Sequence, residues 1–224
     1  KEWIEYPVLH FDLSTFKNCD LSLFPEKFDM QLRRFEKQFG IEDMRKSAGN
    51  RLTQLIEQAE SMTGRKVVII IDEYDAPLLD VLHDETKLEA VRTIMQEFYA
   101  PIKANSSHIH FAFITGITKF SQLSIFSTIN NLTNISMDPE FSTICGITKD
   151  ELDTVLKEDI ALLASKNHVS FERMRELLRE NYDGYHFSRE GEDIFNPYSL
   201  MRSFAAGFID NYWYASGTST YLIH

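Results

Sequence analysis

Two stretches in the first part of the chain repeat apolar residues with the period of an α-helix. The first carries an apolar residue at every third or fourth position from Phe24 to Phe39, and Gly40 follows it directly. The second does the same between Met44 and Ala59. Such spacing gathers the apolar side chains on one face of a helix. We therefore predict two amphipathic helices whose apolar faces pack into a core.

Three shorter apolar stretches are typical of β-strands. They are residues 6–14 (YPVLHFDLS), 67–71 (VVIII) and 109–115 (IHFAFIT). The VVIII stretch does not alternate between apolar and polar residues, which indicates a strand covered on both faces, as in a parallel sheet. A further helical stripe runs from Leu88 to Ile102. Strands that alternate with helices predict a parallel α/β layer.

The pattern changes after Gly146. Thr148 and Glu151 have the spacing of a capping box, which predicts the start of a helix. Short helical stripes follow, and no further apolar strand run comes after them. We therefore predict two domains: an α/β core over residues 1–146, and a small helical or winged-helix-like appendage over residues 147–224.

Two dipeptides divide the appendage further. Asp183-Gly184 predicts a tight turn of the kind found in hairpins, because glycine adopts positive φ without steric cost. Asn196-Pro197 is typical of the first residues of a helix. The expected order is helix, helix, hairpin-like segment and helix.

Composition and charge exclude several classes of protein. With 17 Phe and 9 Tyr among 224 residues, the chain has ample bulk for a core and is not disordered. A net charge of −11 argues against a surface that binds nucleic-acid backbone along its whole length, although a local basic pocket remains compatible. No apolar run approaches the ~20 residues that cross a bilayer, so we expect no membrane span.

The two cysteines and the first residue bear on cellular context. Cys19 and Cys145 match no metal-ligand spacing and are too few for a disulfide framework, which indicates a reducing, cytoplasmic location. The chain begins with Lys1 rather than Met. We therefore expect it to be a piece of a longer protein.

Neighbouring acids follow directly after the VVIII stretch. The carboxyl end of a parallel strand is where α/β proteins bind ligands. Nucleoside triphosphatases need two carboxylates there: one holds Mg²⁺ through its water shell, and the next polarises the attacking water. Asp72 is therefore the candidate magnesium ligand and Glu73 the candidate catalytic base. Acids also end ordinary strands, so a solvated strand end is the alternative.

Three further residues lie near these strand ends in the sequence. Thr115, at the tip of the last strand, is placed to orient the attacking water or sense the γ-phosphate, or simply to complete the strand end. Lys119 is the candidate nucleotide-binding residue, with a solvated surface lysine as the alternative. Asp75 either supports the acids of the site from behind or caps the segment from Pro77 to Leu82, and we favour the cap.

Several longer segments of the chain resemble the AAA-ATPase-like family of bacterial P-loop proteins. The segments are VVIIIDEYDAP, FAFITGITKFS, SIFSTINNL, CGITKDEL, ENYDGYHFS, FNPYSL and NYWYASGTSTYLI, in this order. The resemblance implies a P-loop NTPase-like parallel sheet with a helical lid or winged helix, and ATP and Mg²⁺ as ligands. It also implies that VVIIIDE is the Walker B strand, with Asp72 for magnesium, Glu73 as the base and Thr115 on the sensor strand.

Members of this family often carry a nuclease-like domain of the PD-(D/E)XK type, which these 224 residues do not include. The resemblance therefore makes nucleic acid a possible partner only through that domain of a longer chain. Nucleotide is the partner expected of the residues in hand. An oligomer is compatible with the sequence.

One element of the family is missing from the sequence. Nothing fits G-x-x-x-x-G-K-[ST], the loop that supplies a backbone cradle, a lysine and a magnesium-binding hydroxyl. We therefore expect a core that lacks its phosphate-loop strand, with the gap beside the sensor strand. We also expect this fragment to be incompetent in hydrolysis and to hold no ordered ATP.

Three functions remain open from the sequence. The first is an ATPase module in which ATP and Mg²⁺ control the appendage. The second is a non-catalytic interaction scaffold that keeps the α/β core without turnover. The third is a metal-dependent nuclease or phosphatase that uses Asp72, Glu73 and Asp75, for which the acid-x-lysine strand of the fused nucleases is not found.

Overall fold

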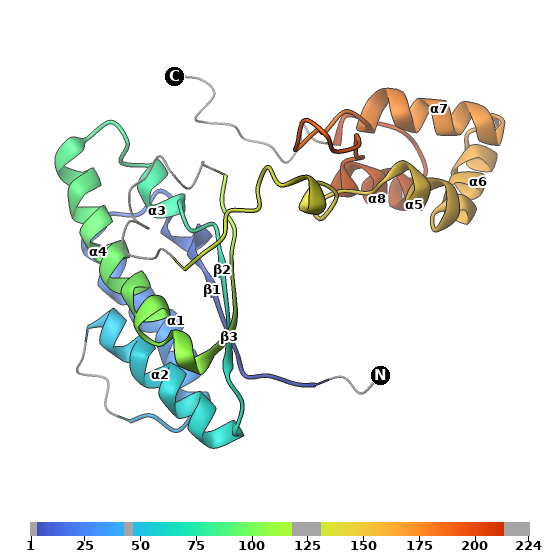
Figure 1. The fold of residues 1–224 in the computed structure, drawn as a ribbon. Helices are drawn as coiled ribbons and strands as arrows, with labels where there is room; N and C mark the ends of the chain where they lie inside the picture. The colour runs from blue at the N-terminus through green and yellow to red at the C-terminus, as the bar shows by residue number, and fades with distance from the viewer. Residues whose placement is uncertain (1–3, 43–46, 118–130, 213–224) are drawn as a thin grey trace. The chain divides into compact units, whose positions relative to one another are not determined.

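A computed structural model describes residues 4–42, 47–117 and 131–212 of the chain (Figure 1). The chain divides into two compact units, Lys1–Leu132 and Thr133–His224. Each unit has an apolar core of its own. The division comes earlier in the sequence than the boundary that we predict after Gly146.

Three parallel strands form the sheet of the first unit. They are β1 (Val8–Asp12), β2 (Val67–Asp72) and β3 (Ile109–Ile114), and they lie side by side in this order. In register, Leu9 pairs with Ile69, and Ile69 with Ala112. The α/β class and the parallel pairing predicted from the sequence are confirmed.

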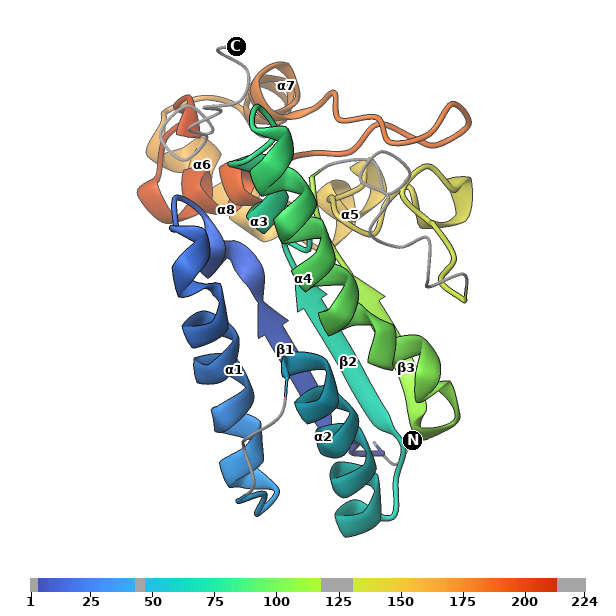
Figure 2. The same cartoon turned by 90° about the vertical axis from the view of Figure 1, so that its left-hand side faces the viewer.

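The helices of the first unit lie on one face of this sheet, as Figures 1 and 2 show. They are α1 (Phe24–Gln38), α2 (Ala48–Thr63), the short α3 (Ala76–Leu79) and α4 (Glu85–Ala104). The steps from β1 to β2 and from β2 to β3 run in the same direction across the sheet. Because parallel crossovers are right-handed, both steps place their helices on the same side.

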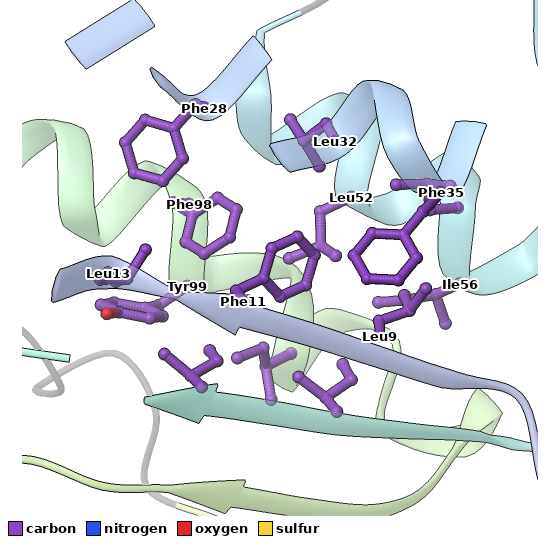
Figure 3. Packing of buried hydrophobic residues seen from close by; sticks show 14 of the residues in the cluster. Leu9, Phe11, Leu13, Phe28, Leu32, Phe35, Leu52, Ile56, Phe98 and Tyr99 are labelled. Carbon is purple, nitrogen blue, oxygen red and sulfur yellow. The ribbon is translucent and has the colours of Figure 1, made fainter. Parts of the chain in front are cut away.

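Aromatic and aliphatic side chains fill the space between the helices and the sheet (Figure 3). Phe11 of β1 stands at the centre, with the rings of Phe35 and Phe98 each 5.3 Å away in edge-to-face contacts. Burying a side chain of this size contributes about 1.5–3 kcal/mol. The apolar stripes of the sequence therefore face the core, as their helical spacing predicts.

The other face of the sheet, which we call the open face, consists of apolar residues that no described element of the first unit covers. Its apolar members are Val8, Val68, Ile70, Phe111 and Phe113, and the exposed His10 lies among them in register with Ile70. Phe111 is 53% exposed. The prediction that the VVIII stretch is covered on both faces thus differs from the described part of the first unit, where only alternate residues of β2 are fully buried.

The second unit begins with a 3₁₀ helix, η5 (Pro139–Phe141), and continues with the α-helices α5 (Lys149–Thr154), α6 (Lys157–Lys166), α7 (Phe171–Tyr182) and α8 (Pro197–Ala206). The capping box of Thr148 and Glu151 is confirmed, since each side chain accepts the other's backbone N–H. Asn196 caps α8 by accepting the N–H of Ser199.

Two isolated antiparallel bridges join segments of the second unit. Ile147 pairs with Phe195, and Tyr185 pairs with Ile194. Gly184, just before the second bridge, has a φ of 112°, so the predicted positive φ is confirmed and the residue lies outside a helix. The bridged segment is hairpin-like, but its loop comes after Tyr185 rather than at Asp183-Gly184.

The boundary between the units lies before Gly146 because the preceding residues pack within the second unit. A Cβ atom added to Gly146 would lie 2.0 Å from Ile194 Cδ1. Ser142 is buried, and its side chain lies close to Gly191 in the same way. These contacts tie residues 133–146 to the bridged segment that follows α7.

Candidate functional site

Three acids follow one another where β2 ends, and their side chains point to three different partners. Asp72 is exposed at the strand end, Glu73 is half-buried and Asp75 is fully buried. Glu73 has a φ of 51°, a left-handed backbone conformation that a residue with a side chain rarely adopts. The three carboxylates therefore lie in three different environments.

Asp72 faces the neighbouring strand β3. Its Oδ1 accepts a hydrogen bond from the hydroxyl of Thr115 and another from the N–H of Glu73, the latter at 3.0 Å. The backbone strengthens this link, because Thr115 N–H donates to Ile71 O and Thr115 O accepts from Tyr74 N–H, both at 2.9 Å. The structure therefore brings Asp72 and Thr115 together at the carboxyl edge of the sheet.

Glu73 turns the other way, toward the segment that follows β1. Its Oε2 forms an ion pair with the ammonium of Lys17, the residue after the 3₁₀ turn η1 (Leu13–Phe16). The contact with Glu73 raises the pKa of the Lys17 amine, against a smaller opposing effect of burial. Glu73 Oε2 itself is shielded from solvent.

Lys17 is a residue of the site that the sequence analysis misses. A signal was present, because Lys17 follows shortly after a predicted parallel strand. The carboxyl ends of parallel strands meet at one edge, so a lysine there belongs beside the acids of β2. Its distance in sequence from Glu73 conceals this relation.

Asp75 connects the loop after β2 to the loop after β3. Its Oδ2 accepts the N–H of Ile117 at 3.0 Å. The residue stands at the N-cap position of α3, but its side chain makes no capping bond, so the predicted capping role is wrong. Burial raises the pKa of the nearby Tyr99 hydroxyl well above its ordinary value, and the charge of Asp75 adds to this effect.

The edge of the sheet carries a concentration of negative charge. Besides the acids of β2, Asp12 ends β1 and Asp80 accepts the N–H of Asn18. A hydrogen bond from Ser14 lowers the pKa of Asp12, so this carboxyl is ionised at neutral pH. Since like charges repel at short range, a nucleotide would need a cation to approach this edge.

The residues present fit a magnesium ion. Asp72 offers an exposed carboxylate beside the Thr115 hydroxyl, and Mg²⁺ binds through few protein oxygens while keeping several waters. Among the described residues, no three His, Cys, Asp or Glu side chains gather as a metal-binding cluster. Asp72, Glu73 and Asp75 accordingly do not converge on one point.

Lys119, the candidate nucleotide-binding residue, lies outside the described residues. Within the described ranges, every helix is too short or too polar to serve as a membrane span.

Comparison with known proteins gives one family and one curated relative. Residues 1–126 match a family described as "Predicted AAA-ATPase". The chain is 34% identical over 188 residues to an "Uncharacterized protein in vnfD 5'region" from Azotobacter chroococcum mcd 1. The match covers 84% of this chain but only 34% of the relative, so the chain spans about a third of that protein's length. No solved structure matches the chain.

Proposed function

The chain belongs to the predicted AAA-ATPase family, and from this premise we propose that it is the hydrolysing part of a P-loop ATPase. ATP and Mg²⁺ bind, in this proposal, at the carboxyl ends of β2 and β3. The observation that carries the proposal is the contact between Asp72 and Thr115 at that edge. It joins a carboxylate and a hydroxyl from neighbouring strands where parallel sheets bind ligands.

Each residue has one task in this reaction. Asp72 would hold the cation through its water shell, and a bound cation would supply positive charge against the phosphates. Glu73 polarises the attacking water. Thr115 orients that water or the γ-phosphate by its hydroxyl, and Lys119 remains the candidate residue for binding the nucleotide.

The open face and the free edge of β3 support a phosphate-binding loop supplied from outside these 224 residues. Among the described strands β3 is the last of the sheet, and its outer edge would accept one more parallel strand. If that strand precedes β1 in the chain, its crossover runs opposite to the two crossovers already described. Right-handedness then puts its helix on the open face. A single strand–helix unit therefore completes both the edge and the face.

The same unit would create the ligand site. The direction of strand order would reverse between the added strand and β3, and α/β sheets bind ligands at such a switch point. The loop between the added strand and its helix lies at the carboxyl edge. In this arrangement it faces Thr115 and Asp72, the two residues already in contact there.

In this proposal, the nucleotide controls the second unit, and a longer protein supplies further domains. We assign the helices of the second unit and its bridged segment to a lid of helical or winged-helix type, whose position follows the nucleotide. A nuclease-like domain in the remaining length would bring any nucleic-acid contact. The location expected for such a protein is the cytoplasm.

Substitution of the acids tests this function in the longer protein that includes the upstream segment. Glu73→Gln keeps the shape of the side chain but cannot polarise water, so ATP turnover should fall ~10²–10⁴-fold while nucleotide binding persists. Asp72→Asn should weaken magnesium-dependent binding as well. Glu57→Gln, an exposed position on α2, is the matched control and should change neither.

The alternatives predict other results. Unchanged hydrolysis in Glu73→Gln would remove this residue from the role of base. ATP binding without turnover in the unsubstituted protein would favour a non-catalytic scaffold. A nuclease or phosphatase that uses Asp72, Glu73 and Asp75 is not supported by the geometry, because the three side chains diverge.

Titration of nucleotide against the 224-residue chain tests where the phosphate loop lies. We expect no magnesium-dependent ATP binding by this chain and clear binding by the longer protein. Binding at micromolar concentration by the 224 residues alone would mean that they contain the phosphate cradle themselves.

A further inference from the structure

Among the described strands, β1 ends the sheet on the side opposite to β3. In a parallel ladder, the N–H and C=O groups of successive residues point to alternate sides of a strand. The carbonyl of Pro7 accepts the N–H of Val68 in β2. The backbone groups of His10 and Asp12, which lie an odd number of positions further on, therefore point away from β2. An edge with such groups is a template for pairing with a strand of another chain.

Helix α1 lies beside this outer edge of β1 (Figure 2), and its side chains bond to these groups. The amide of Gln31 makes two bonds with the backbone of Asp12. Its Nε2 donates to the carbonyl oxygen at 2.5 Å, and its Oε1 accepts the N–H at 3.2 Å. Arg34 Nη2 donates to the carbonyl oxygen of His10 at 2.7 Å. A neighbouring strand would offer the same kinds of donor and acceptor to these backbone groups.

A third side chain of α1 continues this row beyond the end of β1. Lys27 Nζ donates to the carbonyl oxygen of Thr15, in η1, at 2.6 Å. Lys27, Gln31 and Arg34, which we call the α1 edge row, lie four and three positions apart and so share one face of the helix. Each stands one position before a buried residue of the apolar stripe of α1. Packing of that stripe into the core therefore brings the α1 edge row against the outer edge of β1.

We propose that the α1 edge row closes the outer edge of β1 to strands of other chains, so that an added strand joins the sheet on the β3 side. A strand that approached β1 would first have to displace the bonds of Gln31 and Arg34. The strand kept away is that of a second copy of this chain, because the β1 edges of two copies can pair about a two-fold axis. The inference goes beyond the proposed function, and it holds whether or not the longer protein hydrolyses ATP.

Hydrogen exchange in the longer protein tests whether Gln31 protects this edge. In Gln31→Ala the N–H of Asp12 loses its acceptor, so its exchange should accelerate about two- to ten-fold, the range that corresponds to one hydrogen bond. The N–H of Phe11 points toward β2 and should keep its protection. Gln38→Ala, at an exposed glutamine of the same helix, is the matched control and should change neither rate.

Sedimentation of the longer protein tests what the opened edge does. Replacing all three residues of the α1 edge row by alanine should add a self-association step that the unsubstituted protein lacks over the same concentration range. The exchange of the Asp12 amide should then slow as the concentration rises, because a second copy supplies the acceptor. The matched control replaces Arg33, Lys37 and Gln38, exposed residues of the same three types on α1, and should not add this step.

A proline in β1 tests whether this association uses the strand edge. His10→Pro, added to the variant without the α1 edge row, removes an N–H that points away from β2. Because proline has no N–H to offer a partner strand, the added self-association should disappear. Persistent association in this variant would mean that the copies meet through another surface, and it would overturn the proposal.

Three further results would also contradict the inference. Unchanged exchange of Asp12 in Gln31→Ala would mean that the amide of Gln31 does not protect the edge. A variant without the α1 edge row that exchanges Asp12 rapidly but never associates would mean that the open edge attracts no strand. Loss of protection at Phe11 together with Asp12 would mean that the row stabilises β1 itself rather than closing its edge.

Discussion

Gly116 shows how closely the residues behind Thr115 are packed. A Cβ atom added there would lie 2.4 Å from Tyr74 Cε1 and 2.6 Å from Asp75 Oδ1. Both are closer than atoms in contact can be, so neighbouring groups would have to move. The one residue type without a Cβ atom therefore lets the loop after β3 lie directly against the buried Asp75.

We expect Gly116→Ala to destabilise the first unit by about 1–3 kcal/mol, the usual cost of overpacking. The disturbance should centre on the bond between Asp75 and the N–H of Ile117, so hydrogen exchange of that amide should accelerate. In Gly64→Ala the added Cβ meets nothing within 4 Å, and only backbone strain is expected. Unchanged exchange at Ile117 in Gly116→Ala would contradict this account.

At the scale of residues, the sequence predicts which residues lie at the ends of strands. It does not predict contacts between residues of different loops. The sequence predicts that Asp72 and Thr115 both lie at strand ends, and the carboxyl ends of parallel strands share one edge of the sheet. Asp75 was interpreted as a cap, since its neighbours in sequence look like a helix start. Its actual partner, the N–H of Ile117, belongs to another loop, and no local pattern points to it.

A buried ion pair joins helices α1 and α2. The guanidinium of Arg51 binds both carboxylate oxygens of Glu36, at 2.6 and 2.7 Å, and Asp29 at 2.9 Å. Glu36 is only 1% exposed. Charges taken so far out of water are tolerated only while they stay paired. The apolar stripe of α1 gives no hint of this pair.

Arg51→Met should cost about 3–5 kcal/mol, because it leaves the Glu36 carboxylate buried and unpaired. Arg33→Met, which removes an arginine that is 58% exposed, should cost less than about 1 kcal/mol. Denaturant unfolding measures both. The double variant Arg51→Met with Glu36→Met should recover much of the loss, and failure to recover would show that packing rather than charge is lost.

Asp29 makes the stability of these helices depend on pH. Burial opposes its ionisation, but the bonds from Arg33 and Arg51 outweigh burial, and the pKa of Asp29 is lowered. Its contribution to stability is therefore complete above the unfolded pKa of about 4 and disappears as the pH falls through the folded value. Asp29→Asn should flatten the acid limb of the unfolding curve below pH 5. An unchanged acid limb would exclude this group.

Helices α2 and α4 approach closely at Gly49. A Cβ atom there would lie 2.4 Å from the carbonyl oxygen of Glu97. Gly49→Ala should therefore destabilise the fold by about 1–3 kcal/mol, although alanine is the better helix former. Ser61→Ala, at an exposed position of α2, should stay within about 0.5 kcal/mol. A stabilised Gly49→Ala would mean that the helices can separate at little cost.

The sequence predicts the position of a helix well where its apolar residues recur with a clear helical period. The stripe from Phe24 and the glycine at position 40 predict α1 closely, since Gly40 has a φ of 66° directly after the helix. In the second unit, the stripe from Leu152 to Leu163 predicts one helix, but the chain forms α5 and α6. Hydrophobic spacing continues across the short break at Val155 and Leu156, so the pattern alone cannot show it.

The two units of the molecule have separate cores, and this gives a prediction about their independence. In Gly146→Ala the added Cβ would lie 2.0 Å from Ile194 Cδ1, inside the second unit. Hydrogen exchange should accelerate in α7 and α8, while the amides of β2 keep their protection. Equal loss of protection in both units would show that they unfold together.

At the scale of the whole molecule, the sequence predicts class and strand direction but not which faces are covered. VVIII reads as a strand buried on two sides, and Val68 and Ile70 instead lie on the open face. An apolar composition indicates that a strand is suited to burial on both faces. It does not say whether the covering element lies within the same stretch of chain.

The parallel pairing of β2 and β3 also has a consequence during synthesis on the ribosome. Val68 leaves the exit tunnel before Phe111, its partner in register, which emerges only as the 43rd residue after it (111 − 68 = 43). At roughly 5–20 residues per second, β2 waits several seconds with an apolar stretch free of charge and proline, the kind of segment that pairs with other chains. A nascent chain stalled before β3 should therefore crosslink to a holding chaperone more strongly than one stalled after α4 and β3 have both emerged.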